Sequence, residues 1–172
     1  MSDRDFPPYT YTPGGTPHPV SDPDGHSYGQ RPAALGAADV TELDVCPAFR
    51  WGVELFRRGY YWEAHEEWEA VWRALGRQGA AADFVKGLIK LAAAGVKARE
   101  GNGEGVRRHA RRAAQLFRSA ARVGAAAAGG LTAERLGREA DELVKTAATW
   151  LPLGDGRPVV FWPELIGRSD RL

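Results

Sequence analysis

The chain has 172 residues, of which 44% are hydrophobic and 26% charged, and its formal net charge is +1. This length is enough for one domain with a sizeable core and a tail, and the near-neutral charge gives no general argument for nucleic acid or membrane binding. A single cysteine, Cys46, excludes an internal disulfide and a zinc site built on several thiolates. No apolar run approaches the ~20 residues that span a bilayer, and no secretion signal begins the chain. We therefore expect a cytoplasmic protein that does not enter the membrane.

Residues 1–38 are rich in proline and glycine and almost free of aliphatic side chains. Such a segment buries too little apolar surface to offset the entropy lost on ordering. The sequence therefore predicts an arm that is either disordered or wrapped over the domain surface. We attribute His18 and His26 to the polarity of this arm and place neither in a site.

Helical signals begin at Pro47, which suits the first position of a helix, and the helix it opens should stop at Gly59. A second helix, Tyr60–Leu75, then turns back to form a helical hairpin. Asp83 is the expected N-cap of a third helix reaching about Arg99. Because this third helix is apolar on nearly all sides, it should be the buried centre of a bundle.

Asn102 is the expected N-cap of a fourth helix, and Thr132 that of a fifth, which carries Trp150 in its core stripe and ends at Pro152. The sequence thus predicts an all-α fold with a single bundle of about five helices over residues 39–152. Residues 153–172 are apolar but broken by prolines, so we expect an extended segment that packs on the bundle or covers a partner.

The second helix holds the first candidate site. One face combines a histidine with aromatic residues, and Glu63 and Glu67 point away from it toward solvent. The pattern His65-Glu66-x-x-Glu69 can present two ligands to one metal ion, with the middle glutamate as a base. A catalytic zinc site usually needs three protein ligands, so we expect no metal and no cofactor here. A structural histidine, hydrogen-bonded within the core, is the leading interpretation.

Basic residues define two further candidates. On the third helix a narrow strip of lysines, Lys86, Lys90 and Lys97, should lie at a groove or at an exit to water. On the fourth helix a basic face is a candidate anion-binding patch, with Arg107, Arg108, Arg111 and Arg112 as its centre. The acidic second helix can neutralise this face, and no aromatic residues interleave with the arginines as single-strand stacking requires. Nucleic acid binding is therefore disfavoured.

Three blocks of the sequence resemble the family catalogued as domain of unknown function 309. They are Leu55–Trp72 (LFRRGYYWEAHEEWEAVW), Phe84–Ala98 (FVKGLIKLAAAGVKA), and Gly101-Asn102 followed by Gly105-Val106. The resemblance implies a small all-α bundle and no established activity. It marks eight residues: Gly59, Tyr61, His65, Glu66, Glu69, Trp72, Gly87 and Asn102.

Three positions depart from the family pattern, which tends to have Asn at Arg57, Gln at Lys90 and a second His at Lys97. The last departure matters most, because an ammonium group repels a cation and favours a carboxylate partner. This chain therefore argues against a metal site shared across the family.

Three hypotheses remain. The first, which we favour, is a non-enzymatic interaction module with a buried polar network; its partner is another protein or a second copy of the chain. The second is a small-molecule or hydrolytic site with His65 or Glu66 as base and a lysine holding an anion. The third is RNA or anion binding through the basic face of the fourth helix. The residues assigned to the polar site are Tyr61, His65, Glu66, Glu69, Lys90, Lys97 and Asn102.

Overall fold

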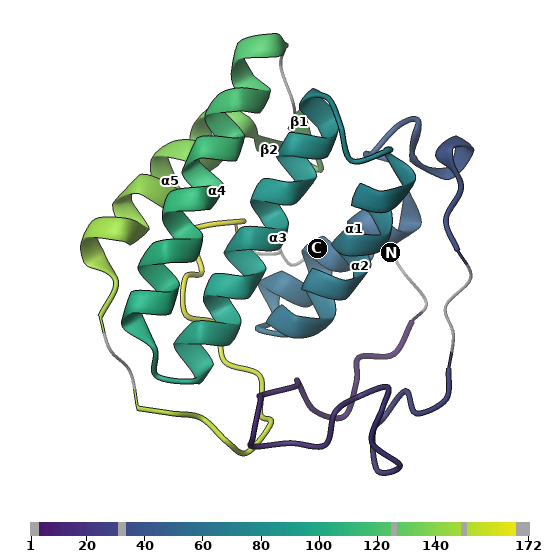
Figure 1. The fold of residues 1–172 in the computed structure, drawn as a ribbon, viewed down its shortest axis with the longest axis vertical. Coiled ribbons are helices and arrows are strands. Elements are labelled where there is room, and N and C mark those ends of the chain that lie inside the picture. Colours follow the sequence, from purple (N-terminus) through teal and green to yellow (C-terminus); the bar gives the residue numbers. More distant parts are fainter. Residues whose placement is uncertain (1–3, 31–33, 125–126, 149–150, 168–172) are drawn as a thin grey trace.

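A computed structural model describes residues 4–30, 34–124, 127–148 and 151–167 of the chain. The predicted all-α bundle is confirmed: the described residues form five α-helices, one short 3-10 helix and a two-stranded ladder (Figure 1). In chain order these are η1 (Ala37–Val40), α1 (Pro47–Arg57), α2 (Tyr61–Ala74), α3 (Ala80–Arg99), α4 (Gly103–Val123), β1 (Ala127–Ala128), β2 (Leu131–Thr132) and α5 (Ala133–Thr146). None of the helices in this described part is both long and apolar enough to cross a bilayer.

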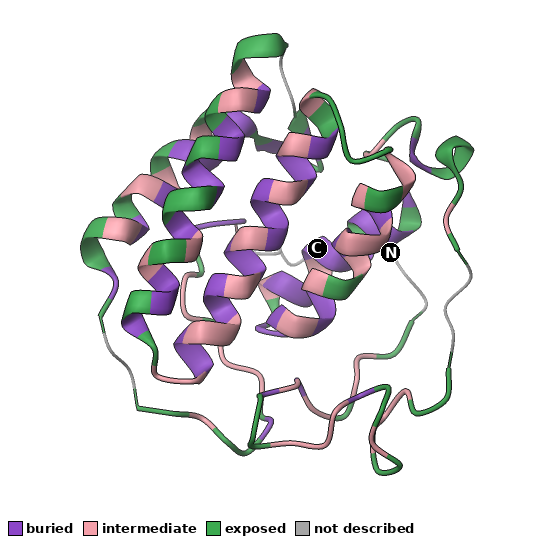
Figure 2. Cartoon of the chain, viewed as in Figure 1, coloured by how far each residue is buried: buried purple, intermediate pink, exposed green. Residues whose placement is uncertain are grey.

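Helix α3 lies at the centre of the bundle, with α2 packed on one side and α4 on the other (Figure 1). Helix α1 packs on α2, and α5 packs on α4. The central position explains the apolar sequence of α3, whose buried residues form most of its length (Figure 2). Two glycines let the neighbouring helices approach closely: a Cβ at Gly87 would collide with the ring of Phe117, and one at Gly95 with the ring of Tyr61.

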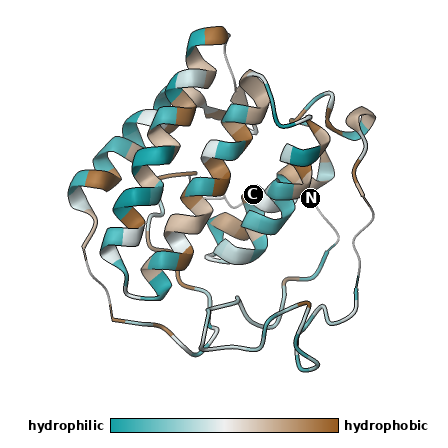
Figure 3. Ribbon diagram, in the orientation of Figure 1, coloured by the Kyte–Doolittle hydropathy of each residue, from teal (hydrophilic) through white to brown (hydrophobic). Residues whose placement is uncertain are grey.

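The helix ends follow the capping signals in most cases. Pro47 opens α1, and Gly59 turns the chain with a φ of +85°. The side-chain oxygen of Asn102 accepts a hydrogen bond from the Gly105 amide at 2.7 Å, as an N-cap of α4 should. Thr132 caps α5 in the same way. Helix α4 is strongly amphipathic, with hydrophilic and hydrophobic residues alternating along it in Figure 3.

Two details differ from the prediction. Helix α3 begins at Ala80, because three alanines extend it back to Gly79, and Asp83 lies inside its first turn, where its carboxylate accepts a hydrogen bond from Ser119 at 2.7 Å. Between α4 and α5 the structure has a short antiparallel hairpin, β1–β2, instead of a plain link. The expected core position of Trp150 lies outside the described residues.

The arm and the C-terminal segment both lie across one side of the bundle and contact each other there (Figure 1). The Thr10 amide donates to the Gly156 carbonyl at 2.8 Å, and the amide of Leu153 donates to the carbonyl of Arg99 at 2.8 Å. The C-terminal segment also donates from the Phe161 amide to the hydroxyl of Tyr61 at 2.9 Å. The division of the chain at residues 38 and 152 stays a prediction.

One sequence expectation fails because of the arm. Glu63 was expected to face solvent, but its side chain is only 6% exposed. Within α2 it does point away from the helices of the core; the arm lies over it and removes it from water. Its carboxylate accepts hydrogen bonds from Thr10 and Tyr11 of the arm.

Candidate functional site

His65 lies at the surface edge of α2, with 29% of its side chain exposed. Its Nδ1 atom is 3.2 Å from Oε1 of Glu66, a residue that is itself half exposed. This hydrogen bond is the main cause that lowers the pKa of Glu66. The expectation of a core histidine in a buried network is therefore wrong in this respect: Ala64 and Trp68 fill the core side of the helix instead.

Glu69 is bound to a different helix and not to His65. Its Oε1 atom is 2.7 Å from Nζ of Lys86 on α3, and that ammonium group also lies 3.7 Å from the centre of the Trp72 ring. The His65/Glu69 pair therefore does not converge on one point. Among the described residues, no group of three or more His, Cys, Asp or Glu side chains is arranged to hold a metal ion.

Two contacts fix the register of α2 against α3. Glu69 pairs with Lys86, and the ring of Tyr61 lies against Gly95. Since these helices run antiparallel, each residue forward along α2 matches one backward along α3. This count places His65 at the level of Lys90.

Three contacts fix the register of α3 against α4 in the same way. Asp83 binds Ser119, Gly87 meets Phe117, and the side chain of Lys97 lies over Gly105. The antiparallel count then places Lys90 at the level of Arg112, and Ala93 at the level of His109. The charge of Arg112 acts on Lys90, and the charges of Lys90 and His65 act on His109, so basic side chains from three successive helices lie near one another.

We call this set the cationic cluster; it consists of His65 from α2, Lys90 and Lys97 from α3, and Arg108, His109 and Arg112 from α4. Lys97 has an acidic partner, Glu100, at 2.6 Å. Lys90 makes no ion pair or hydrogen bond with any of the described residues. Burial is the largest cause that lowers the pKa of Lys90; the nearby charges of Lys86 and Arg112 lower it further, and the carboxylate of Glu69 acts in the opposite direction.

His109 lies within the cluster and feels most of its charges. Burial lowers the pKa of His109 to about 4, and the charges of Lys90, Arg108, Lys97 and His65 act in the same direction. At neutral pH its imidazole is therefore uncharged, with one N–H available as a donor. The cluster combines cationic side chains with a neutral hydrogen-bond donor, which is the chemistry of an anion site.

The arginines of α4 do not form one surface. Arg107 turns toward α5, where it donates to the Ala147 carbonyl at 2.8 Å. Arg111 falls on the outward side of α4, and Arg108 and Arg112 fall on the edge next to α3. The anion-binding patch predicted from the sequence is thus divided between two sides of the helix.

Two other residues of the predicted polar site have structural roles. Tyr61 is fully buried and its hydroxyl receives the Phe161 amide, and burial raises the pKa of its phenol. Asn102 caps α4. Neither takes part in the cationic cluster.

Residues 49–109 match the model of a family described as "Domain of unknown function (DUF309)". This part of the chain is similar to that family. This confirms the resemblance seen in the three sequence blocks. No curated protein and no solved structure matches the chain. The DUF309 match runs from α1 to the middle of α4, and it includes every residue of the cationic cluster except Arg112.

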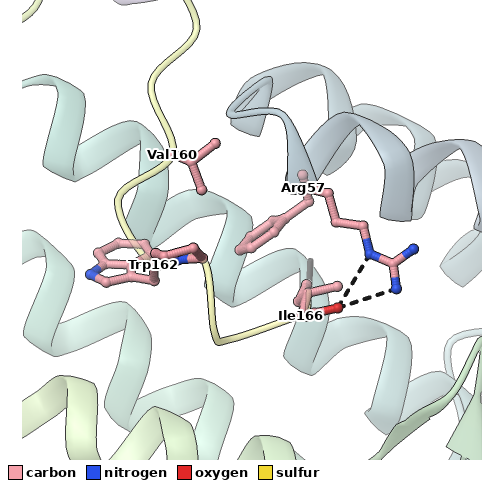
Figure 4. Close-up of a pocket in the computed structure, with 7 residues that line it drawn as sticks. Arg57, Val160, Trp162 and Ile166 are labelled. Atoms are coloured by element: carbon pink, nitrogen blue, oxygen red, sulfur yellow. Dashed lines mark hydrogen bonds between the residues drawn. The ribbon is translucent and has the colours of Figure 1, made fainter. Parts of the chain in front are cut away.

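A small hollow lies between α1 and the C-terminal segment (Figure 4). Its lining residues are Phe56, Arg57, Val160, Trp162, Pro163, Ile166 and Gly167. Its volume of about 10 Å³ is at most that of one water molecule. Arg57 donates from Nε and Nη2 to the carbonyl of Ile166 at 3.2 Å each, so it fastens the C-terminal segment to α1 (Figure 4).

The sequence interpretation missed three polar residues within residues 49–109. His109 was not singled out from the sequence, and its position near Lys97 follows only from the register of the α3–α4 hairpin. Glu63 and Arg99 are buried by segments distant in sequence. Arg99 had a local signal, because it continues the apolar stripe of Leu88 and Gly95 at helical spacing, where a charged residue is out of place.

Proposed function

We propose that this protein is a non-enzymatic binding module whose cationic cluster holds a phosphorylated small molecule. One observation carries the proposal: Lys90 makes no ion pair or hydrogen bond with the described residues, although it is half-buried at the level of His65 and Arg112. The charge of Glu69 does act on Lys90, but that carboxylate is bound to Lys86. Like charges brought together in a partly dry setting oppose each other. A bound anion would offset this electrostatic repulsion, so the arrangement is suited to binding one.

Phosphate suits the donors of the cluster better than other anions do. Arg108 and Arg112 present planar forks that bind phosphate oxygens in pairs, and Lys90 adds a point charge. The neutral imidazole of His109 can donate one further hydrogen bond. The same cations repel a metal ion, and the cluster contains no hydroxyl or thiol nucleophile.

A small ligand is favoured over RNA. Recognition of single strands depends on aromatic faces on which bases stack. The ring of Trp72, beside the cluster, is covered on one face by the ammonium group of Lys86. We therefore expect binding of phosphate groups without a contribution from bases.

Calorimetric titration of the full chain with inorganic pyrophosphate at low salt tests the proposal. Removing one charge-assisted contact costs roughly 1.5–3 kcal/mol, so Lys90→Gln should weaken binding by at least about tenfold. Arg111→Gln is the matched control, because it removes a positive charge from the outward side of α4. Equal affinity of the two variants would show that net charge, and not the cluster, determines binding.

Two further measurements separate the alternatives. A single-stranded RNA that binds with a steep salt dependence, when pyrophosphate does not bind, would favour an RNA-binding role. Steady hydrolysis of a phosphate ester, abolished by His65→Ala, would contradict the non-enzymatic part of the proposal.

A further inference from the structure

The buried polar groups of the described chain meet in one place, away from the cationic cluster. They are Thr10 and Thr12 of the arm, Glu63 of α2 and Arg99 of α3, each no more than 6% exposed. Burying a carboxylate and a guanidinium is costly unless each is well paired. The contact between the arm and the bundle therefore depends on specific hydrogen bonds to these two charged side chains.

Glu63 binds two successive groups of the arm. Its Oε2 atom accepts the hydroxyl of Thr10 at 2.7 Å, and its Oε1 atom accepts the backbone amide of Tyr11 at 2.8 Å. The Tyr11 side chain points the other way and packs against the Trp62 ring, 5.3 Å between centres. Burial alternates along Thr10, Tyr11 and Thr12, as in an extended strand with one face against the protein.

Arg99 binds the next residue of the arm, Thr12. Its Nε donates to the hydroxyl of Thr12 at 2.7 Å, and its Nη1 donates to the carbonyl of Arg157 at 2.9 Å. Its Nη2 is buried and has no hydrogen-bond partner among the described residues. Thr12 thus offers one oxygen to a fork that has two nitrogens to satisfy.

We propose that Glu63 and Arg99 form a receptor slot for an extended peptide of the pattern Thr-x-Asp, which residues 10–12 occupy as an intramolecular stand-in. The first residue supplies a hydroxyl to Glu63, and the second supplies its backbone amide. At the third position an aspartate, unlike threonine, offers two oxygens and can engage Nε and Nη2 of Arg99 together. A bidentate pair of this kind is both stronger and more selective than a single hydrogen bond to a hydroxyl.

The arm is held in a way that would let a competing peptide displace it from Glu63 and Arg99. Residues 4–30 contain no helix or strand, so they are held by side-chain contacts and a few backbone bonds. A third contact of the arm with Glu63 is incomplete: Nε2 of His26 is buried, makes no hydrogen bond with the described residues, and lies 3.6 Å from Oε1. A competing peptide must overcome the high effective concentration of a tethered segment, and the added pair with Arg99 provides that advantage.

A substitution in the full chain tests the slot directly. Thr12→Asp should raise the melting temperature above that of the unmodified protein, and Thr12→Asn is the control of the same shape that offers one oxygen only. A melting temperature for Thr12→Asp at or below that of Thr12→Asn would overturn the proposal. This result would not bear on pyrophosphate binding, which depends on other residues.

Binding in trans gives the second test. The receptor is the full chain with Thr10→Val/Thr12→Val, and the ligands are fluorescent peptides of residues 6–16 with Thr12→Asp or Thr12→Val. We expect the aspartate peptide to bind at least tenfold more tightly in fluorescence anisotropy, and Arg99→Lys in the receptor to remove this preference.

Hydrogen exchange at residues 9–12 reports whether the arm of the receptor has left the slot. Equal affinity of the two peptides, or no binding when the arm has left, would overturn the proposal. An arm that stays protected without its threonine hydroxyls would overturn it too. Should the double variant fail to fold, the melting comparison at position 12 decides.

Discussion

The perturbed imidazole of His109 makes the stability of this protein depend on pH. In the folded state its pKa is lowered from 6.5 to about 4, whereas the unfolded chain titrates near 6.5. Between these values the unfolded chain binds the proton and the folded protein does not, so stability falls as the pH drops from about 6.5 to about 4. The full difference corresponds to about 3 kcal/mol. Because His109 is partly exposed, solvent screening reduces this, and we expect about 1–2 kcal/mol.

Urea unfolding of the wild type and His109→Gln, each at neutral pH and at about pH 4.5, measures this contribution. The wild type should lose about 1–2 kcal/mol more than the variant as the pH falls, because glutamine does not titrate. His18→Gln, in the arm, is the control for the loss of a histidine elsewhere. If His109→Gln shows the same pH dependence as the wild type, the imidazole is not held neutral by its neighbours and the reasoning about the cluster is wrong.

Two further predictions concern the backbone of the bundle, and both are measured as the free energy of unfolding in denaturant. Gly95→Ala should lose roughly 1–3 kcal/mol because its Cβ collides with the Tyr61 ring. Gly137→Ala, whose Cβ meets its nearest neighbour at 3.6 Å, should gain about 0.5–1 kcal/mol; equal effects would contradict the packing of α2 on α3. Asn102→Ala should lose about 1 kcal/mol and Asn102→Gly only a few tenths, and equally large losses in both would mean that the amide does more than cap α4.

Local signals were sufficient to predict most of the fold. Proline at the start of α1, Asn102 before α4 and Thr132 before α5 act through contacts within one turn, so the sequence reveals them directly. The sequence of α3, which is apolar on nearly all sides of the helix, likewise predicted its position at the centre of the bundle. Asp83 misled because a capping residue and an acidic residue in a first turn look alike in sequence, and the preceding alanines extend the helix without any marker of their own.

The site was harder to predict because its parts meet only through register and long-range docking. His65 and Lys90 were both identified, but their common level depends on the pairing of Glu69 with Lys86 across two helices. Glu63 lies on the side of α2 that faces solvent in an isolated helix, and it is buried only because Thr10 docks on it from more than fifty residues away. Periodicity describes one helix at a time and carries no information on such contacts.

The most direct measurement of the central claim is a nuclear magnetic resonance titration of His109 with and without inorganic pyrophosphate. An anion held among Lys90, Arg112 and His109 stabilises the protonated imidazole, so pyrophosphate should raise the pKa of His109 from about 4 toward its ordinary value of 6.5. The Lys90→Gln variant should show a smaller rise, because the anion is held less tightly. A pKa that pyrophosphate leaves unchanged would contradict the account.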